Sequence, residues 1–226
     1  QDEEIDWTRD ITETSGCRGD TDEQMIQAIT FDLDGVYFPD GKNKFIAALT
    51  KLGVPEHEAK RVFLKSDEMN KQYKTGNLSD DSFWMWAAKE WKLTKSPQEL
   101  IDLLIASYSV DENVVRTIHT LHKNGYKTLI CSNNFPARIE GLQKKFGFLD
   151  EFDAVVLSYE EGICKPDKNI FRALIKKAGV PAEAILFSDD NIDNLKGAKE
   201  VGIKTFVYCG FDAFLQELKK EGIKGI

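Results

Sequence analysis

Two aspartates separated by one residue stand where a buried strand is expected to end. The segment from Thr30 to Phe38 reads TFDLDGVYF, so Asp32 and Asp34 follow an apolar run. A buried carboxylate costs several kcal/mol unless a cation or a hydrogen-bond donor faces it. The pair therefore either lies in a solvated turn or holds a cation and takes part in chemistry.

Polar groups of a similar kind follow three other apolar runs of the chain. They are Ser132 and Asn133 after residues 127–131, Lys165 after residues 154–157, and Asp189 and Asp190 after residues 184–187. Ligand sites of open parallel sheets lie beyond the carboxyl ends of the strands, where the strand order reverses. We therefore expect these groups to meet Asp32 and Asp34 in one crevice.

Four carboxylates in one crevice repel each other and require a cation. Oxygen ligands without histidine or cysteine favour Mg²⁺ over Zn²⁺, and a lysine and a serine beside that ion form an anion site. The combination suits phosphoryl transfer, with Asp32 as nucleophile and metal ligand. Asp34 would protonate the leaving oxygen and then deprotonate the attacking water. Gly35 would let the backbone turn, so that the Asp34 carbonyl faces the metal while its side chain faces the substrate.

The elements that must position these groups alternate between strand and helix. Five near-continuous apolar runs predict strands that are covered on both faces. They are Ala28–Leu33, Lys127–Cys131, Ala154–Leu157, Ala184–Phe187 and Lys204–Tyr208. Helical periodicity separates the later four runs, so the sequence predicts an α/β fold with a doubly wound, Rossmann-like parallel sheet.

The stretch between the first two predicted strands is far longer than one crossover needs, and its pattern is helical. We expect an all-helical cap at residues 40–108, inserted into a core domain of residues 25–39 and 109–226. Residues 1–24 carry nine acids against two bases, so we expect them to form a mobile acidic tail. The chain begins with Gln rather than Met, so the true start of this segment is an open question.

Several details of the predicted cap can be tested against a structure. Capping boxes are expected at Ser96–Glu99 and at Ser109–Glu112. The helical pattern puts Phe83 and Trp86 in the cap core, which leaves Trp84 or Met85 as the more exposed side chain. Lys42 and Lys44 could meet an anionic substrate near the site entrance, but we expect them to be solvated.

The ordered motifs resemble those of the haloacid dehalogenase superfamily, in its phosphatase branch with a small helical cap (subfamily I, like β-phosphoglucomutase and the epoxide-hydrolase N-domain). The resemblance covers about residues 26 to 220. It is carried by Asp32-x-Asp34-Gly35-Val36, Ser132, Lys165-Pro166 and Asp189-Asp190-x-x-x-Asn194. Dehalogenases of this family lack an acid two residues after the nucleophile, so Asp34 favours phosphate-ester chemistry.

The resemblance implies a role for each motif residue. Asp32 would form an aspartyl-phosphate, while Ser132, Asn133 and Lys165 would bind the transferred phosphoryl group. Mg²⁺ would be held by Asp32, the Asp34 carbonyl and Asp190. Asp189 and Asn194 would support these ligands from behind, and the cap would close over the site and select the substrate.

The leading hypothesis is a Mg²⁺-dependent hydrolase of small phosphate monoesters. A sugar-phosphate mutase of the same superfamily would use the same residues. Remoter alternatives are a phospho-accepting regulatory module, such as a receiver domain, and a non-catalytic binding protein. The motifs leave the substrate, the choice between phosphatase and mutase, and the oligomeric state open.

Composition limits the partners of this 226-residue chain. A net charge of −8 and the absence of a Lys/Arg block argue against nucleic acid and anionic membranes as partners. The four cysteines show no metal-binding spacing, and no apolar run is long enough to span a membrane or to form a signal sequence. We therefore expect a cytoplasmic protein that acts on a small phosphorylated molecule.

Overall fold

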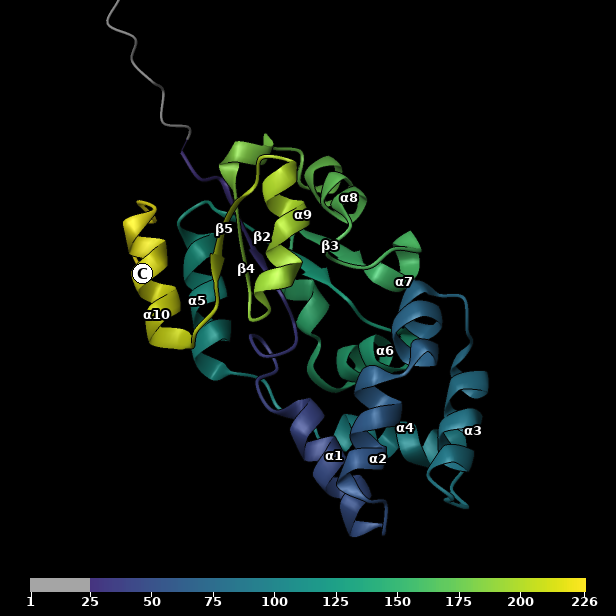
Figure 1. Cartoon of the computed structure of the whole chain (residues 1–226). Helices are drawn as coiled ribbons and strands as arrows, with labels where there is room; N and C mark the ends of the chain where they lie inside the picture. Colours follow the sequence, from purple (N-terminus) through teal and green to yellow (C-terminus); the bar gives the residue numbers. More distant parts are fainter. Residues whose placement is uncertain (1–24) are drawn as a thin grey trace, which may run out of the picture.

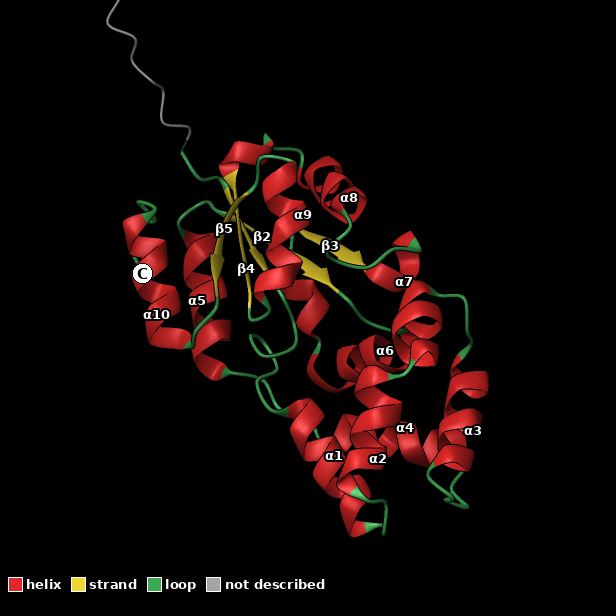
Figure 2. Cartoon of the chain, viewed as in Figure 1, coloured by secondary structure: helices red, strands yellow, loops and turns green. Residues whose placement is uncertain are grey.

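The computed structural model describes residues 25–226, so the tail predicted for residues 1–24 lies outside the described part of the chain. A five-stranded parallel sheet carries helices on both faces, and a group of further helices lies beyond one end of it (Figure 1, Figure 2). The strands are β1 (Ala28–Phe31), β2 (Lys127–Ser132), β3 (Ala154–Leu157), β4 (Ile185–Asp189) and β5 (Lys204–Val207). The predicted doubly wound α/β fold is confirmed.

The order of the strands places the crevice of the sheet beside β1. The order is β3-β2-β1-β4-β5, and all neighbouring pairs are parallel. It reverses between β1 and β4, where an open α/β sheet binds its ligands. Phe31 of β1 lies opposite Ser188 of β4, so the next residues, Asp32 and Asp189, lie side by side at the carboxyl edge of the sheet. This order is the Rossmann type and differs from that of receiver domains, in which the second strand lies at the edge.

Strand β1 is shorter than predicted, because it ends at Phe31 rather than at Leu33. Both aspartates therefore lie in the turn that follows the strand. The turn is closed by two backbone hydrogen bonds, from Phe38 N to Leu33 O at 2.8 Å and from Gly35 N to Phe38 O at 3.1 Å. Gly35 has φ of +76°, a conformation that glycine adopts at no steric cost.

Alternate side chains of the strands enter two separate apolar layers. The helices of the core are α5 (Glu112–Lys123), α6 (Pro136–Phe146), α7 (Ser158–Glu161), α8 (Lys168–Ala178), α9 (Leu195–Glu200) and α10 (Phe211–Lys220). Ile29 and Phe31 pack in the layer that holds residues of α5 and α10, whereas Ala28 and Phe187 pack in the layer that holds residues of α8 and α9. Burial on both faces explains why the strands are apolar throughout.

The long stretch after β1 is helical, as predicted, and lies beyond the carboxyl end of the sheet (Figure 1). We call it the cap. Its elements are α1 (Gly41–Lys51), α2 (Glu56–Lys60), η1 (Arg61–Lys65), η2 (Glu68–Gln72), η3 (Tyr73–Thr75), α3 (Asp80–Glu90) and α4 (Pro97–Ala106). The proposed limits of the two domains, residues 40–108 for the cap and the rest for the core, stay a prediction.

One predicted capping box is confirmed and the other is wrong. Ser96 caps α4, and both reciprocal bonds with Glu99 are present. At α5 the N-cap is Asp111, whose side chain accepts a hydrogen bond from Asn113 N at 2.9 Å. Ser109 instead accepts a bond from Lys44 Nζ at 3.2 Å. An aspartate directly before the helix is itself a strong N-cap, and the sequence pattern did not separate the two candidates.

Of the two candidates for the more exposed side chain of α3, Trp84 is fully buried. Its indole Nε1 donates to the hydroxyl of Tyr73 at 3.0 Å, and its ring packs edge-on against Phe45. Met85 is 57% exposed, as expected. The cap therefore buries two adjacent aromatic residues of α3, Phe83 and Trp84, against different neighbours.

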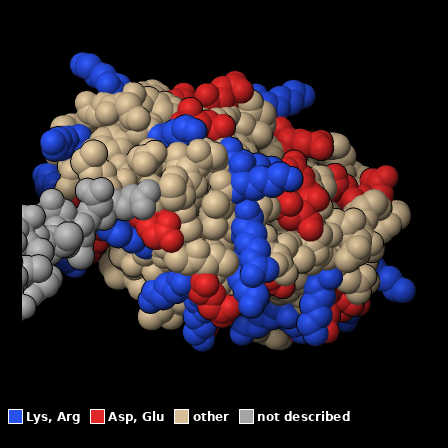
Figure 3. All heavy atoms as spheres, turned by 90° about the horizontal axis from the view of Figure 1, so that it is seen from above, with Lys and Arg blue, Asp and Glu red and all other residues tan. Residues whose placement is uncertain are grey.

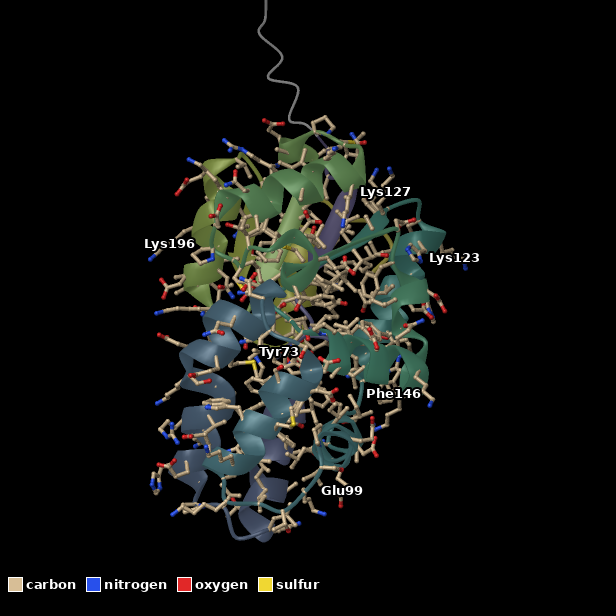
Figure 4. The ribbon with its side chains drawn as sticks, turned by 90° about the vertical axis from the view of Figure 1, so that its right-hand side faces the viewer. Tyr73, Glu99, Lys123, Lys127, Phe146 and Lys196 are labelled. Carbon is tan, nitrogen blue, oxygen red and sulfur yellow. The ribbon has the colours of Figure 1, made fainter. Side chains whose placement is uncertain are left out.

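The cap rests on the core along α6. A Cβ at Gly141 of α6 would overlap the side chain of Ile105 at the end of α4, so the two helices lie in close contact. Lys145 Nζ donates to the carbonyls of Ile105 and Tyr108, each at 2.9 Å, and so satisfies the C-terminal end of α4. Tyr73 stacks on Phe135 with ring centroids 4.6 Å apart. Figure 4 shows Tyr73 where the cap meets the core, and Glu99 at the far end of the cap.

The surface carries charges of both signs. On the face opposite the cap, Lys and Arg side chains form a band across the molecule, with Asp and Glu gathered beside it (Figure 3). Among residues 25–226, no helix combines the length and the apolar character that a membrane span requires. The predicted cytoplasmic location stays a prediction.

Candidate active site

A buried lysine joins two of the predicted acids. Lys165 Nζ lies 2.9 Å from Asp32 Oδ1 and 2.5 Å from Asp189 Oδ2, and all three side chains are almost completely buried. Burial by itself would lower the pKa of Lys165, but the two carboxylates raise it above its ordinary value. Burial also raises the pKa of Asp32, an effect that Lys165 partly offsets and that Asp189 and Asp34 reinforce. The lysine therefore stays charged and holds the site together.

The backbone of Lys165 is held in place by the loop after β2. The side chain of Asn133 accepts a hydrogen bond from Lys165 N at 2.7 Å and donates to Lys165 O at 3.0 Å. A Cβ at Gly197 of α9 would overlap the carbonyl oxygen of Pro166, so this helix supports the same loop from the other side. Because the Asn133 side chain is engaged in this way, only its backbone N–H is left to serve the predicted phosphate contact.

The two acids after β4 have different surroundings. Asp189 is fully buried, and its oxygens accept hydrogen bonds from Lys165, from Asn191 N at 2.9 Å and from Asn194 Nδ2 at 3.0 and 3.1 Å. Asp190 is exposed and lies against the backbone of Gly35. This difference favours Asp190 as a direct metal ligand. Asp189 and Asn194 would instead fix the positions of the neighbouring site residues through hydrogen bonds.

Three carboxylates meet where a cation would fit. Asp32, Asp189 and Asp190 each offer an oxygen within 4.8 Å of the other two. Asp32 Oδ1 is buried and, despite its ion pair with Lys165, has no hydrogen bond among the described residues. Partial desolvation of its carboxyl group, followed by the charges of Asp32 and Asp189, raises the pKa of Asp190 to about 6. A divalent cation would relieve this repulsion, and hard oxygen donors suit Mg²⁺.

Replacing Gly35 with alanine should weaken Mg²⁺ binding. A Cβ at this position would overlap Asp190 Oδ2 and push that carboxylate away from Asp32. We expect the dissociation constant for Mg²⁺, measured by calorimetry, to rise by about tenfold or more. Gly125→Ala is the matched control, because Gly125 has a similar φ of +83° with nothing within 4 Å of the added methyl group. Equal Mg²⁺ affinity in Gly35→Ala and the unaltered chain would rule out Asp190 as a ligand.

Sequence reasoning missed a buried arginine that binds Asp34. Arg138 of α6 is 1% exposed, and its Nη2 and Nη1 lie 2.7 and 3.1 Å from the two oxygens of Asp34. Its other donors are also used, because Nη1 donates to Tyr108 Oη at 3.0 Å and Nε to Asn134 Oδ1 at 2.6 Å. The only signal in the sequence was its position four residues after Asn134, one helical turn past the serine motif.

Lys42 is a second cation on Asp34 and is not simply solvated. Its Nζ lies 3.0 Å from Asp34 Oδ2, although the side chain is 38% exposed. Burial by itself would raise the pKa of Asp34, but Arg138 and then Lys42 outweigh it and lower the pKa to about 2. Asp34 is therefore ionised at neutral pH, beside the strand end that carries Asp32.

Ser132 takes its expected place at the end of β2. It is fully buried and lies two residues beyond Ile130, the partner of Phe31 across the sheet. Its hydroxyl is 3.4 Å from Asn134 Nδ2, which is a long hydrogen bond. All the motif residues predicted from the sequence thus lie at one edge of the sheet, and the roles assigned to them stay predictions.

This fold and this arrangement of motif residues identify an α/β hydrolytic core with an inserted helical cap. The chain belongs to the family of haloacid dehalogenase-like hydrolases, whose family model matches residues 26–202. The resemblance seen in the sequence is therefore confirmed at the level of the family.

Individual relatives agree with this assignment. An uncharacterised protein of Dictyostelium discoideum is 30% identical over 82% of this chain and 92% of its own length. The D-ribitol-5-phosphate phosphatase of Bacteroides thetaiotaomicron is 26% identical over 80% of this chain and 91% of its own. Other relatives are longer, and the match spans only 38% of the bifunctional epoxide hydrolase 2 of Sus scrofa.

Solved structures share the fold. A haloacid dehalogenase family enzyme of Bacteroides thetaiotaomicron, solved with magnesium and inorganic phosphate, superposes with a TM-score of 0.70 at 23% identity. The superposition covers 83% of this chain and 96% of that one.

Proposed function

We propose that this chain is a Mg²⁺-dependent hydrolase of small phosphate monoesters that works through an aspartyl-phosphate on Asp32. The observation that carries the proposal is the pairing of Asp32, beside Lys165 and the acidic cluster, with a second acid two residues later. A dehalogenase needs no acid at position 34, whereas in this chain Lys42 and the buried Arg138 both form ion pairs with Asp34. The name of the phosphatase relative and the magnesium and phosphate in the solved structure agree with this choice.

The residues of the chain have distinct tasks in the proposed reaction. A carboxylate oxygen of Asp32 attacks phosphorus, forming a new P–O bond as the bond to the leaving oxygen breaks. Lys165, Ser132 and the backbone N–H of Asn133 hold the phosphoryl oxygens. Bound Mg²⁺, held by Asp32, the Asp34 carbonyl and Asp190, would neutralise charge on the phosphoryl group.

Asp34 moves the proton in both half-reactions. A substrate bound as its monoanion supplies the first proton, which Asp34 accepts and passes to the leaving oxygen as the P–O bond breaks. Asp34 then takes a proton from the water that attacks the aspartyl-phosphate, which releases phosphate and restores Asp32. Arg138 and Lys42 keep Asp34 ionised in the described state. The negative charge of an approaching phosphate ester opposes them, because a nearby like charge raises the pKa of a carboxyl group.

Phosphate release is the direct test of this proposal. The chain should release phosphate from a generic aryl phosphate in the presence of Mg²⁺, and chelation should abolish the activity because the carboxylate cluster is left without its cation. A screen of sugar phosphates, nucleotides and two-carbon phosphates then ranks the substrates by kcat/KM. Release of halide without release of phosphate would overturn the proposal. A bisphosphate requirement with phosphate retained in the product would identify the mutase instead.

A further inference from the structure

A turn of the cap lies directly over the loop that carries Lys165. We call residues 73–76 the cap turn. The carbonyl of Lys74 accepts a hydrogen bond from Ser158 Oγ at 2.6 Å and lies 3.7 Å from Sγ of Cys164, the residue before Lys165. A Cβ at Gly76 would overlap the carbonyl oxygen of Tyr159, so the turn is in close contact with the core. The backbone of Lys74 therefore lies next to the loop that leads to Lys165.

The cap turn is also fixed from its other side. Tyr73 Oη donates to Asp80 at 2.5 Å, and the same carboxylate accepts a bond from Ala137 N, at the start of α6, at 3.2 Å. Tyr73 lies at the junction of cap and core in Figure 4. The position of Lys74 relative to the site is thus set by contacts to α3, α6 and the loop before Lys165.

Lys74 and Asp34 affect each other without direct contact, because the charge of Lys74 helps to lower the pKa of Asp34 and the charge of Asp34 acts to raise the pKa of Lys74. The Nζ of Lys74 donates to Asn70 Oδ1 at 2.9 Å, and it forms no ion pair with any described residue. Burial and then the charges of Lys42 and Arg138 lower the pKa of Lys74 to about 8. Lys165, which is paired with two carboxylates, shows the opposite shift. Lys74 is partly buried and keeps some of its surface open to solvent.

Arg138, Lys42 and Lys74 differ in the number of N–H donors that remain free to bind a ligand. Arg138 uses all its nitrogens on Asp34, Tyr108 and Asn134. Lys42 and Lys74 each have three N–H donors and only one described partner, Asp34 for Lys42 and Asn70 for Lys74. Arg138 is therefore a positioning residue for Asp34, whereas the two cap lysines are available to a ligand.

Lys42 lies on the side of the site where the leaving group must be, and the charge of Lys74 acts on the same carboxylate. Asp34 can protonate the leaving oxygen only if that oxygen lies beside its carboxylate, and Lys42 is in direct contact with that carboxylate. The phosphoryl group lies on the other side, toward Lys165. We propose that Lys42 and Lys74 form a subsite for a second anionic group, so that the preferred substrates are phosphate monoesters whose leaving group itself carries a carboxylate or a phosphate. This inference rests on the proposed phosphatase activity.

A matched pair of substrates tests the subsite. O-Phospholactate and its amide have the same leaving oxygen and nearly the same size, and they differ by one negative charge. We expect kcat/KM to be higher for the carboxylate than for the amide. In Lys74→Met the preference for the carboxylate over the amide should fall by about tenfold, mainly through a higher KM for the carboxylate. A propanediol bisphosphate is the third substrate and distinguishes phosphate from carboxylate as the second anion.

Lys71→Met is the control variant, because Lys71 lies one helical turn from Lys74 but points to solvent and pairs with Asp67. It should retain the preference of the unaltered chain. Binding of phospholactate and its amide to the inactive Asp32→Asn variant gives a second readout that does not depend on turnover. The subsite is refuted if the unaltered chain has the same kcat/KM for the carboxylate and the amide. It is also refuted if Lys74→Met lowers kcat/KM equally for both substrates, because that result would mean that Lys74 contacts the phosphoryl group. Failure to hydrolyse any phosphate ester would instead refute the proposed function.

Discussion

Replacing Asp32 with asparagine should abolish phosphate release while the protein stays folded. The amide cannot act as the nucleophile, so we expect kcat to fall by roughly ten-thousand-fold or more. The fold should tolerate the change, because burial and the charges of Asp189 and Asp34 already disfavour the ionised form of Asp32. Lys165 keeps Asp189 as its partner. Phosphate release and the midpoint of thermal unfolding, measured on the same preparation, separate these two effects.

Asp67→Asn is the matched control for Asp32→Asn. Asp67 is an exposed acid of the cap that pairs with Lys71, so its variant should keep full activity. A Mg²⁺-dependent rate that survives Asp32→Asn would exclude Asp32 as the nucleophile. Loss of activity together with a large fall in the thermal midpoint would show that Asp32 has a structural role, contrary to our expectation.

Replacing Arg138 with methionine should destabilise the protein strongly. The substitution leaves the Asp34 carboxylate buried without its main partner, and it also removes the partners of Asn134 and Tyr108. Removing one member of a buried ion pair costs about 3 to 5 kcal/mol in the free energy of unfolding. Urea denaturation at neutral pH measures this loss directly.

The pH dependence of that loss provides a sharper test. The pKa of Asp34 is lowered to about 2 from an ordinary value of 3.8, so its ionised form contributes stability above pH 3.8 that is lost as the pH falls toward 2. The stability difference between the unaltered chain and Arg138→Met should therefore shrink on acidification. A difference that stays constant with pH would show that Arg138 acts through packing alone.

Two companion variants define the origin of the effect. Asp34→Asn combined with Arg138→Met removes both charges, so the double variant should recover part of the stability lost in Arg138→Met. Arg61→Met removes an exposed arginine that also contacts two acids, Glu58 and Glu90, and its effect should be much smaller because surface ion pairs are screened by water. An equal loss in both arginine variants would contradict the importance of burial at Arg138.

Much of the site could be predicted because a parallel sheet brings the carboxyl ends of its strands to one edge. Asp32, Ser132 and Asp189 each follow or end an apolar run, so their meeting needed only the strand assignment and the rule for switch points. Lys165 was found in the same way, through the loop after β3. The helical pattern did not decide between Trp84 and Met85, because the burial of Trp84 depends on Tyr73 and on the packing of the whole cap.

Strand periodicity and motif spacing are local properties of the chain, so the class of fold and the acids and lysine at the edge of the sheet could be inferred without a structure. How Asp34 is held and what faces the leaving group depend on long-range packing. Arg138 reaches Asp34 across 104 positions of sequence, and Lys74 meets Cys164 across 90. Such contacts depend on how the cap and α6 pack onto the sheet, and no local pattern of residues encodes that arrangement.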